Sequence, residues 1–239
     1  MEIKQLLTDV RDALKSPQLE INLFRNAAKE NNPFYFETVN EFYHSAVKRH
    51  PKFPFIRRLQ YGMALLSLPA DHDDYLKMLA GSARRNIKKA KRQGYEFKRI
   101  NYNDYLEDIA EIHGSTPVRQ GEMDPEFLNQ KLKPIDNPES IDQRHDYPYF
   151  GVLKEGKVVA YAGCLVAGEM LLLATIFGHD KYKSDGVVPF LIAGIAAYKY
   201  ANYPHVKYYV YDKYYGASES LRRFKRKFCF EPHTVSWQF

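Results

Sequence analysis

Three apolar segments follow one another closely, and this run limits the fold more than any other feature of the sequence. The segments are residues 149–153, 158–166 and 170–177, with Gly156 in the first connection and Gly168 in the second. Short apolar runs between such turns are typical of β-strands, and connections this short join antiparallel neighbours. The sequence therefore predicts an antiparallel meander at the centre of the fold.

Further strands and helices are predicted on both sides of the meander. Upstream, residues 61–68 predict a strand, and the patterns at 71–94 and 104–113 predict helices. Downstream, the sequence predicts a long helix over 186–203, a strand over 206–211, a helix over 218–227 and a final strand. This order predicts an α/β fold of the α+β kind, in which helices flank a mixed, largely antiparallel sheet.

The first 58 residues have a different pattern. Apolar residues recur at helical spacing in residues 6–14, and helical patterns return at 24–28 and 42–47. Pro51 and Pro54 then interrupt the periodicity. We therefore divide the chain into an N-terminal helical extension, residues 1–58, and a main domain, residues 59–239. We expect the N-terminal helices to pack on the main domain or to join two copies in a homodimer.

Positive charge is concentrated in two predicted helices. Lysine and arginine number 35 against 29 acidic residues, and eleven of these cations lie in the segments 84–92 and 222–227. In the helix over 71–94, Asp71 suits the N-cap, and an apolar stripe from Leu76 to Ala90 leaves the cations toward solvent. Such a face is either ordinary solvated surface or a surface that attracts a polyanion, which means a phosphate-rich cosubstrate or a nucleic acid.

Several classes of protein do not fit the sequence. Cys164 and Cys229 are too few for a disulfide framework, and no Cys/His spacing suits a metal, so we expect no metal site. The longest nearly apolar stretch, residues 186–198, is well short of the ~20 residues that a membrane-spanning helix needs. The N-terminus lacks the apolar core of a signal peptide. We therefore expect a cytoplasmic protein without stable membrane insertion.

Two segments resemble motifs of a known superfamily. Residues 83–95, ARRNIKKAKRQGY, resemble a basic helix that ends in glycine, and residues 224–230, FKRKFCF, resemble a Phe-Lys-x-x-Phe-Gly run. With the element order, they make the chain from about residue 60 onward similar to the GNAT-like acyltransferases, and closest in pattern to the FemAB-type aminoacyl and peptidyl transferases. The resemblance implies a GNAT-like fold and transfer of an acyl or aminoacyl group to an amine on a sugar, peptide, lipid precursor or modified base. It also implies acyl-CoA or aminoacyl-tRNA as cosubstrate and no tightly bound cofactor.

The resemblance also indicates where the donor binds. GNAT enzymes hold the diphosphate of CoA at a glycine-containing loop before a helix, and residues 183–188 stand at that position. Asp185 and Val188 depart from the pattern, so Gly186 either contacts phosphate or merely opens the helix. FemAB-type enzymes use an aminoacyl-tRNA donor and tolerate loss of this loop. The expected donor-binding residues are Lys183, Gly186, Arg84 and Lys88.

Three residues are candidates for catalysis. Lys225 matches the position at which many GNAT enzymes carry a proton-donating tyrosine, and a cation there can stabilise the oxyanion formed when an ester is attacked. His179 follows the third meander strand and has a suitable intrinsic pKa for a general base, with Asp212 as a second base. The simpler alternatives are an exposed lysine and a hydrogen-bonded loop histidine. The expected acceptor contacts, in the loop after residue 113, are Arg119, Gln120 and Glu122.

The sequence is compatible with two functions from different classes. The first is an acyltransferase that forms an amide. The second is a non-catalytic nucleic-acid-binding protein that uses the two basic helices. Binding that falls steeply with salt and ignores acyl donors would favour the second.

Overall fold

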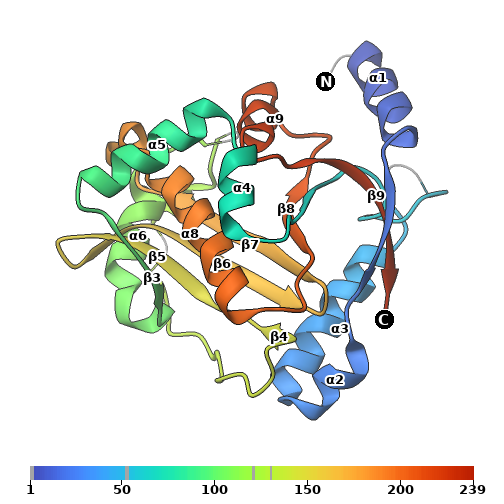
Figure 1. Ribbon diagram of the computed structural model, residues 1–239, viewed down its shortest axis with the longest axis horizontal. Coiled ribbons are helices and arrows are strands. Elements are labelled where there is room, and N and C mark those ends of the chain that lie inside the picture. The colour runs from blue at the N-terminus through green and yellow to red at the C-terminus, as the bar shows by residue number, and fades with distance from the viewer. Residues whose placement is uncertain (1–2, 52–53, 120–121, 130) are drawn as a thin grey trace.

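The computed structural model of the protein describes residues 3–51, 54–119, 122–129 and 131–239, and the side chains from residue 8 onward in those ranges (Figure 1). The helices are α1 (Ile3–Leu14), α2 (Arg25–Glu30), α3 (Pro33–Val47), α4 (His72–Met78), α5 (Gly81–Arg92), α6 (Leu106–Gly114), α7 (Pro125–Leu128), α8 (Val187–Asn202) and α9 (Glu219–Arg226), with short 3-10 helices η1 (Tyr102–Tyr105) and η2 (Asp180–Asp185). The strands are β1 (Gln18–Asn22), β2 (Met63–Ser67), β3 (Glu96–Ile100), β4 (His145–Asp146), β5 (Tyr149–Lys154), β6 (Lys157–Ala167), β7 (Met170–Gly178), β8 (Tyr208–Lys213) and β9 (Glu231–Gln238).

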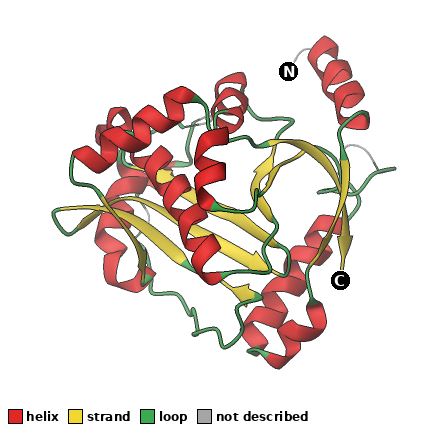
Figure 2. Cartoon of the chain, viewed as in Figure 1, coloured by secondary structure: helices red, strands yellow, loops and turns green. Residues whose placement is uncertain are grey.

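All the strands belong to one mixed sheet with helices on both faces (Figure 2). The order is β1-β9-β2-β8-β7-β6-β5-β3, and β4 pairs with β6 beside this path. The pairs β1–β9 and β7–β8 are parallel, and the other pairs are antiparallel. The predicted meander is present as β5, β6 and β7, which confirms the fold class expected from the sequence.

Alternating residues of β6 show how the helices are divided between the faces. Ala160 and Ala162 face a core that includes Leu191 and Ile195 of α8, whereas Tyr161 between them packs with Ile109 of α6. Helix α8 is apolar on most sides because α4 and α5 cover the side that does not touch the sheet. Helices α2 and α3 lie on the same face as α6 and enclose a third core.

Three strands were missed by the sequence analysis: β1, β3 and the two-residue β4. Strand β3 holds the edge position beside β5, and β1 adds a strand to the N-terminal segment that we predicted as helical. Both are short edge strands with few apolar residues, so their patterns are weak. Strand β2 lies far from the meander's first strand, between β8 and β9. The division of the chain near residue 58 stays a prediction.

The predicted helix over 71–94 is two helices. Asp71 caps α4 as expected, since its carboxylate accepts a hydrogen bond of 2.8 Å from the Asp74 amide. The chain then becomes extended at Leu79 and Ala80. The helix ends there because Leu79 is buried in the core and the Ala80 amide donates to the Lys227 carbonyl instead of continuing the helix.

A buried carboxylate joins the N-terminal segment to the main sheet. Asp146 on β4 is 3% exposed, and its oxygens accept hydrogen bonds from Tyr203 (2.6 Å) and Arg99 (3.2 Å). The Tyr35 hydroxyl of α3 lies 3.4 Å from the same carboxylate. One acidic side chain therefore connects α3, β3, β4 and the end of α8.

We expect Asp146→Ala to lower the free energy of unfolding by roughly 2–4 kcal/mol, because it leaves Arg99 and Tyr203 without their shared acceptor, whereas the Tyr35 hydroxyl keeps the Pro138 carbonyl. The measurement is urea unfolding followed by circular dichroism. The matched control is Glu96→Ala, which removes the exposed partner of Lys98 on the same strand as Arg99 and should leave the midpoint unchanged. Equal midpoints for the two variants would show that Asp146 does not hold these elements together.

Candidate functional site

The two central parallel strands separate after a short stretch of pairing. Only Met170, Leu171 and Leu172 of β7 pair with residues 208–210 of β8, although β7 continues to Gly178 and β8 to Lys213. Central strands are normally well covered, yet Ala174 is exposed and residues 175–178 are half-buried. The two strands are therefore unpaired with each other beyond residues 172 and 210.

A buried lysine holds the end of β8. Lys225 on α9 is 1% exposed, and its ammonium group donates hydrogen bonds of 2.7 Å to the carbonyls of both Tyr211 and Lys213. Burial lowers the pKa of Lys225 to about 8, although the negative charge of Asp212 acts in the opposite direction. An ammonium group has three N–H donors, so one remains after these two bonds.

A half-buried arginine holds the end of β7 in a similar way. The guanidinium of Arg119 donates to the Gly178 carbonyl at 3.2 Å and to the Ile112 carbonyl, and it lies 4.9 Å from the centre of the Phe177 ring. Burial lowers the pKa of Arg119 from its usual range. Arg119 therefore ties the end of α6 to the end of β7.

A buried histidine beside Arg119 was missed by the sequence analysis. His113 is 4% exposed, its Nε2 lies 2.6 Å from the Tyr161 hydroxyl, and its ring stacks on Phe127. Burial, assisted by the Arg119 charge, lowers the pKa of His113 to about 4. The position could have been found from the sequence, because His113 continues the apolar spacing of Ile109 on the predicted helix.

The other predicted catalytic residues lie at the ends of the same two strands. His179 follows β7, and its Nδ1 accepts a hydrogen bond from the Lys181 amide at 3.2 Å, which caps η2. Asp212 lies on β8 close to Lys225, is exposed and has a left-handed backbone with φ of 50°. Glu122 is exposed and forms an isolated antiparallel bridge with Val118 in the loop after α6. Gln120 lies outside the described residues.

The start of α8 is covered by α5. Gly186 has φ of 81°, and a side chain there would place Cβ 2.7 Å from the Asn86 carbonyl oxygen. Asp185 accepts hydrogen bonds from Tyr95 and Gln93, and the Lys89 ammonium lies 3.2 Å from its carboxylate. The hydrogen bond from Tyr95 and the contact with Lys89 lower the pKa of Asp185.

The two basic helices differ in how many of their cations are free. On α5, five exposed cations form no ion pair with a described acidic residue: Arg84, Arg85, Lys88, Lys91 and Arg92. On α9, Arg222 binds Asp9 of α1 through two hydrogen bonds of 2.9 and 2.7 Å, and Arg226 pairs with Glu219. The surface formed by the five α5 cations, which we name the α5 basic face, is therefore the better candidate for attracting a polyanion.

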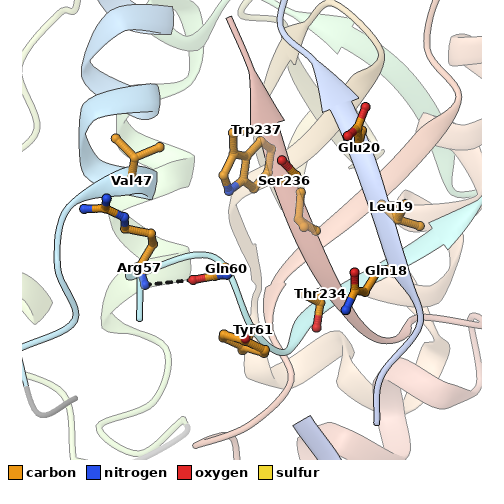
Figure 3. Close-up of a pocket in the computed structure, with 11 residues that line it drawn as sticks. Gln18, Leu19, Glu20, Val47, Arg57, Gln60, Tyr61, Thr234, Ser236 and Trp237 are labelled. Carbon is orange, nitrogen blue, oxygen red and sulfur yellow. Dashed lines mark hydrogen bonds between the residues drawn. The ribbon is translucent and has the colours of Figure 1, made fainter. Parts of the chain in front are cut away.

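A separate pocket lies at the other end of the sheet. It has a volume of about 460 Å³ and lies between the end of α3, the segment 57–61 and strands β1 and β9 (Figure 3). Arg57 and Gln60 stand on one side of it and Ser236 and Trp237 on the other. None of the predicted site residues lines this pocket.

Comparison with known proteins supports the fold. No protein-family model matches the sequence, and no curated protein matches it. Among solved structures, FemX matches with a TM-score of 0.55 and 12% identity, over 72% of this chain and 59% of that one. The C-terminal DUF2156 domain of a putative lysylphosphatidylglycerol synthetase from Agrobacterium fabrum has a TM-score of 0.47 and 15% identity, over 72% and 57%.

A GCN5-related N-acetyltransferase from Kribbella flavida has a TM-score of 0.35 and 9% identity, over 72% of this chain and 53% of that one. The chain thus spans less than three fifths of the length of each of these three structures. The likeness to FemX, together with the mixed nine-stranded sheet, shows that the chain has a GNAT-like fold, as the sequence predicted.

We expect His113 to make the fold sensitive to mild acid. A histidine in an unfolded chain takes up a proton near pH 6.5, whereas folded His113 does so only near pH 4. The unfolded state therefore binds more protons in this interval, and on the order of 3 kcal/mol of stability is lost as the pH falls from 6.5 to 4. Urea unfolding of the wild type and of His113→Gln at pH 7 and pH 4.5 would measure the difference. Equal acid sensitivity in both proteins would contradict the assignment.

Proposed function

We propose that this protein transfers an acyl group, and specifically an aminoacyl group, from an activated donor to an amine. The observation that carries the proposal is the separation of β7 and β8 beside two candidate groups, the ammonium of Lys225 and the imidazole of His179. The unpaired edges of the separated strands can bind the donor's reactive end through main-chain hydrogen bonds. The acceptor is an amine on a sugar, peptide, lipid precursor or modified base.

The contacts around α8 favour aminoacyl-tRNA over acyl-CoA as donor. A diphosphate site at a helix start needs free amides and no nearby negative charge. Here Pro189 removes one amide from the first turn, Asp185 brings a carboxylate, and Asn86 lies against Gly186. The α5 basic face, in contrast, offers five cations to a long polyanion such as tRNA.

The proposed reaction is attack of a neutral amine on the ester carbonyl of the donor. The amine nitrogen forms a bond to the carbonyl carbon, and the carbonyl oxygen becomes an oxyanion. The oxyanion then re-forms the carbonyl of the new amide as the ribose oxygen leaves with the electrons of the broken ester bond. The third N–H of Lys225 stabilises the oxyanion. His179, with Asp212 as a second base, accepts the proton of the amine at Nδ1, whose lone pair becomes available when the Lys181 amide is released, and it passes this proton to the leaving ribose oxygen. Arg119, Gln120 and Glu122 are proposed to meet the acceptor.

The test of the proposal measures loss of the ester bond. The protein is incubated with a pool of radiolabelled aminoacyl-tRNAs and small-molecule fractions of a cell extract, and label is followed from tRNA into an acid-soluble amide. A parallel reaction with acyl-CoA follows free thiol. Salt-sensitive tRNA binding without any loss of ester, in every fraction, would favour the non-catalytic nucleic-acid-binding alternative.

We expect Lys225→Met to lower kcat on the order of 10²-fold with little change in KM, because a fixed cation acts mainly on charge that develops in the transition state. The substitution also removes the donor of the Tyr211 and Lys213 carbonyls and could destabilise the fold. Circular dichroism is therefore used to check that the variant is folded. In the wild type, kcat should also fall as the pH rises above about 8, where Lys225 loses its charge. A folded Lys225→Met protein with normal kcat would show that Lys225 does not take part in the reaction.

We expect the triple variant Arg84→Glu/Lys88→Glu/Lys91→Glu to weaken donor binding steeply at low salt and little at high salt. The fold should be unchanged because these side chains are exposed and unpaired among the described residues. The matched comparison is between single variants: Arg223→Glu on α9, an exposed cation on the other basic helix, should have a much smaller effect than Lys88→Glu on α5. If donor binding by the triple variant and by the wild type depends on salt in the same way, these residues are ordinary solvated surface.

A further inference from the structure

Strand β8 carries a bulge at the point where it leaves β7. In its pairing with β2, the single residue Ala64 lies opposite two residues of β8, Tyr211 and Asp212. An extra residue in one strand bends that strand and turns a side chain out of the regular alternation, and such bulges are common beside active sites. The last residue of β8 that pairs with β7 is Val210, so the bulge lies directly after the two strands separate.

The backbone of Asp212 is held in an unusual conformation. Its φ of 50° lies in the left-handed region, which glycine favours and which aspartate and asparagine tolerate better than most other residues. The Lys225 ammonium donates hydrogen bonds of 2.7 Å to the carbonyls of both neighbours, Tyr211 and Lys213. The main chain is therefore fixed on either side of Asp212, while the Asp212 side chain is exposed. Backbone strain of this kind is often kept where function needs it.

The carboxylate of Asp212 is available to a ligand. Among the residues that the structure describes, it forms no hydrogen bond and no ion pair, and its charge acts on the Lys225 ammonium, which is bonded to main-chain carbonyls. Asp180, just after the end of β7, differs in this respect. Its carboxylate lies 3.9 Å from the Lys183 ammonium, and its charge also acts on Arg119. Of these two exposed carboxylates, Asp212 is therefore the less compensated.

We propose that Asp212 binds the protonated α-amine of the donor and thereby selects an aminoacyl group over a simple acyl group. This inference rests on the proposed function, in which Lys225 meets the carbonyl oxygen of the donor ester. An α-amine is mostly protonated at neutral pH, and its carbon is bonded directly to the reacting carbonyl. The end of β8 then offers a cation to the carbonyl oxygen and a carboxylate to the ammonium. Acetyl, fatty-acyl and N-blocked aminoacyl groups carry no such ammonium.

This contact and the proposed role of Asp212 as a second base predict different kinetics. Removal of a carboxylate that only accepts a proton slows the reaction of every donor alike. Removal of a carboxylate that binds the α-ammonium affects only the donors that carry one. The net charge of the chain is +6, so its overall field does not favour the more positive donor. A preference for that donor therefore requires a local carboxylate.

The test compares donors that differ only at the α-position. A tRNA is acylated with an amino acid or with the matching α-hydroxy acid, and transfer from each ester is measured. The assay uses the full chain, in which none of the described helices is long and apolar enough to cross a membrane. We expect the wild type to prefer the amino form. Asp212→Asn should lower kcat/KM for the amino form about tenfold or more relative to the hydroxy form, because it removes a charged hydrogen bond.

Two further variants control for misfolding and for general negative charge. Asp212→Gly suits the left-handed backbone, so it should lose the preference without lowering the midpoint of urea unfolding. Asp180→Asn removes one exposed carboxylate near the end of the other strand and should leave the ratio of the two donors unchanged. Equal losses with both donors in Asp212→Asn, or loss of the preference in Asp180→Asn, overturn the proposal and leave the transfer reaction standing.

A binding measurement separates the contact from the reaction. The probes are an adenosine whose ribose carries the amino acid as a stable amide, and the same compound with an α-hydroxyl in place of the amine. Tighter binding of the amino probe by the wild type, lost in Asp212→Asn, supports the contact even if no ester is consumed, and only the proposed transfer then fails. If the wild type distinguishes the two forms neither in binding nor in transfer, Asp212 does not select the donor.

Discussion

The centre of this structure depends on the hydrogen bonds that the carbonyl groups at the ends of two parallel strands, β7 and β8, accept. Where β7 and β8 separate, their main-chain groups lose the partners that a continuous ladder would provide, and buried groups of this kind need others. Two cations supply them, the half-buried Arg119 at Gly178 on β7 and the buried Lys225 at Tyr211 and Lys213 on β8. Lys225 lies on α9, and Arg119 lies in the segment after α6 and donates to the Ile112 carbonyl, so the separation is fixed by α9 on one side and by the end of α6 on the other.

This arrangement links stability to the proposed chemistry. A lysine that holds β8 open is at the same time the candidate cation for the oxyanion, so its position is fixed by two hydrogen bonds before any substrate arrives. Such preorganisation is what electrostatic stabilisation of a transition state requires. The neighbouring His113–Tyr161 pair is buried and uncharged at neutral pH, and it packs against Phe177 on the strand that Arg119 holds.

The sequence predicted the meander and α8 because their apolar runs are long and bounded by glycine. It missed β3, whose residues Glu96 to Ile100 are mostly polar, since an edge strand is defined by its pairing with β5 rather than by its own pattern. The break between α4 and α5 depends on Lys227, more than a hundred residues away in the chain. Local periodicity carries no such information.

Only part of the candidate site could be predicted from the sequence. Family-like motifs indicated Lys225, and the structure adds that it is buried, which composition could not show because four other cations lie within the same six residues. The α5 and α9 segments looked equally basic in sequence. They differ because Asp9, far away in the chain, binds Arg222. Non-local partners thus decide which charges are free.

The position of β2 affects how the chain can be made. Strand β2 ends at residue 67, but its two neighbours, β8 and β9, begin about 140 and 160 residues later. During synthesis from the N-terminus this buried strand, Met63 to Ser67, has no strand partner until residues 208–238 have left the ribosome. Long-range pairing of this kind folds slowly and leaves apolar edges open to wrong partners. Strand β2 therefore joins the sheet only after both β8 and β9 have been synthesised.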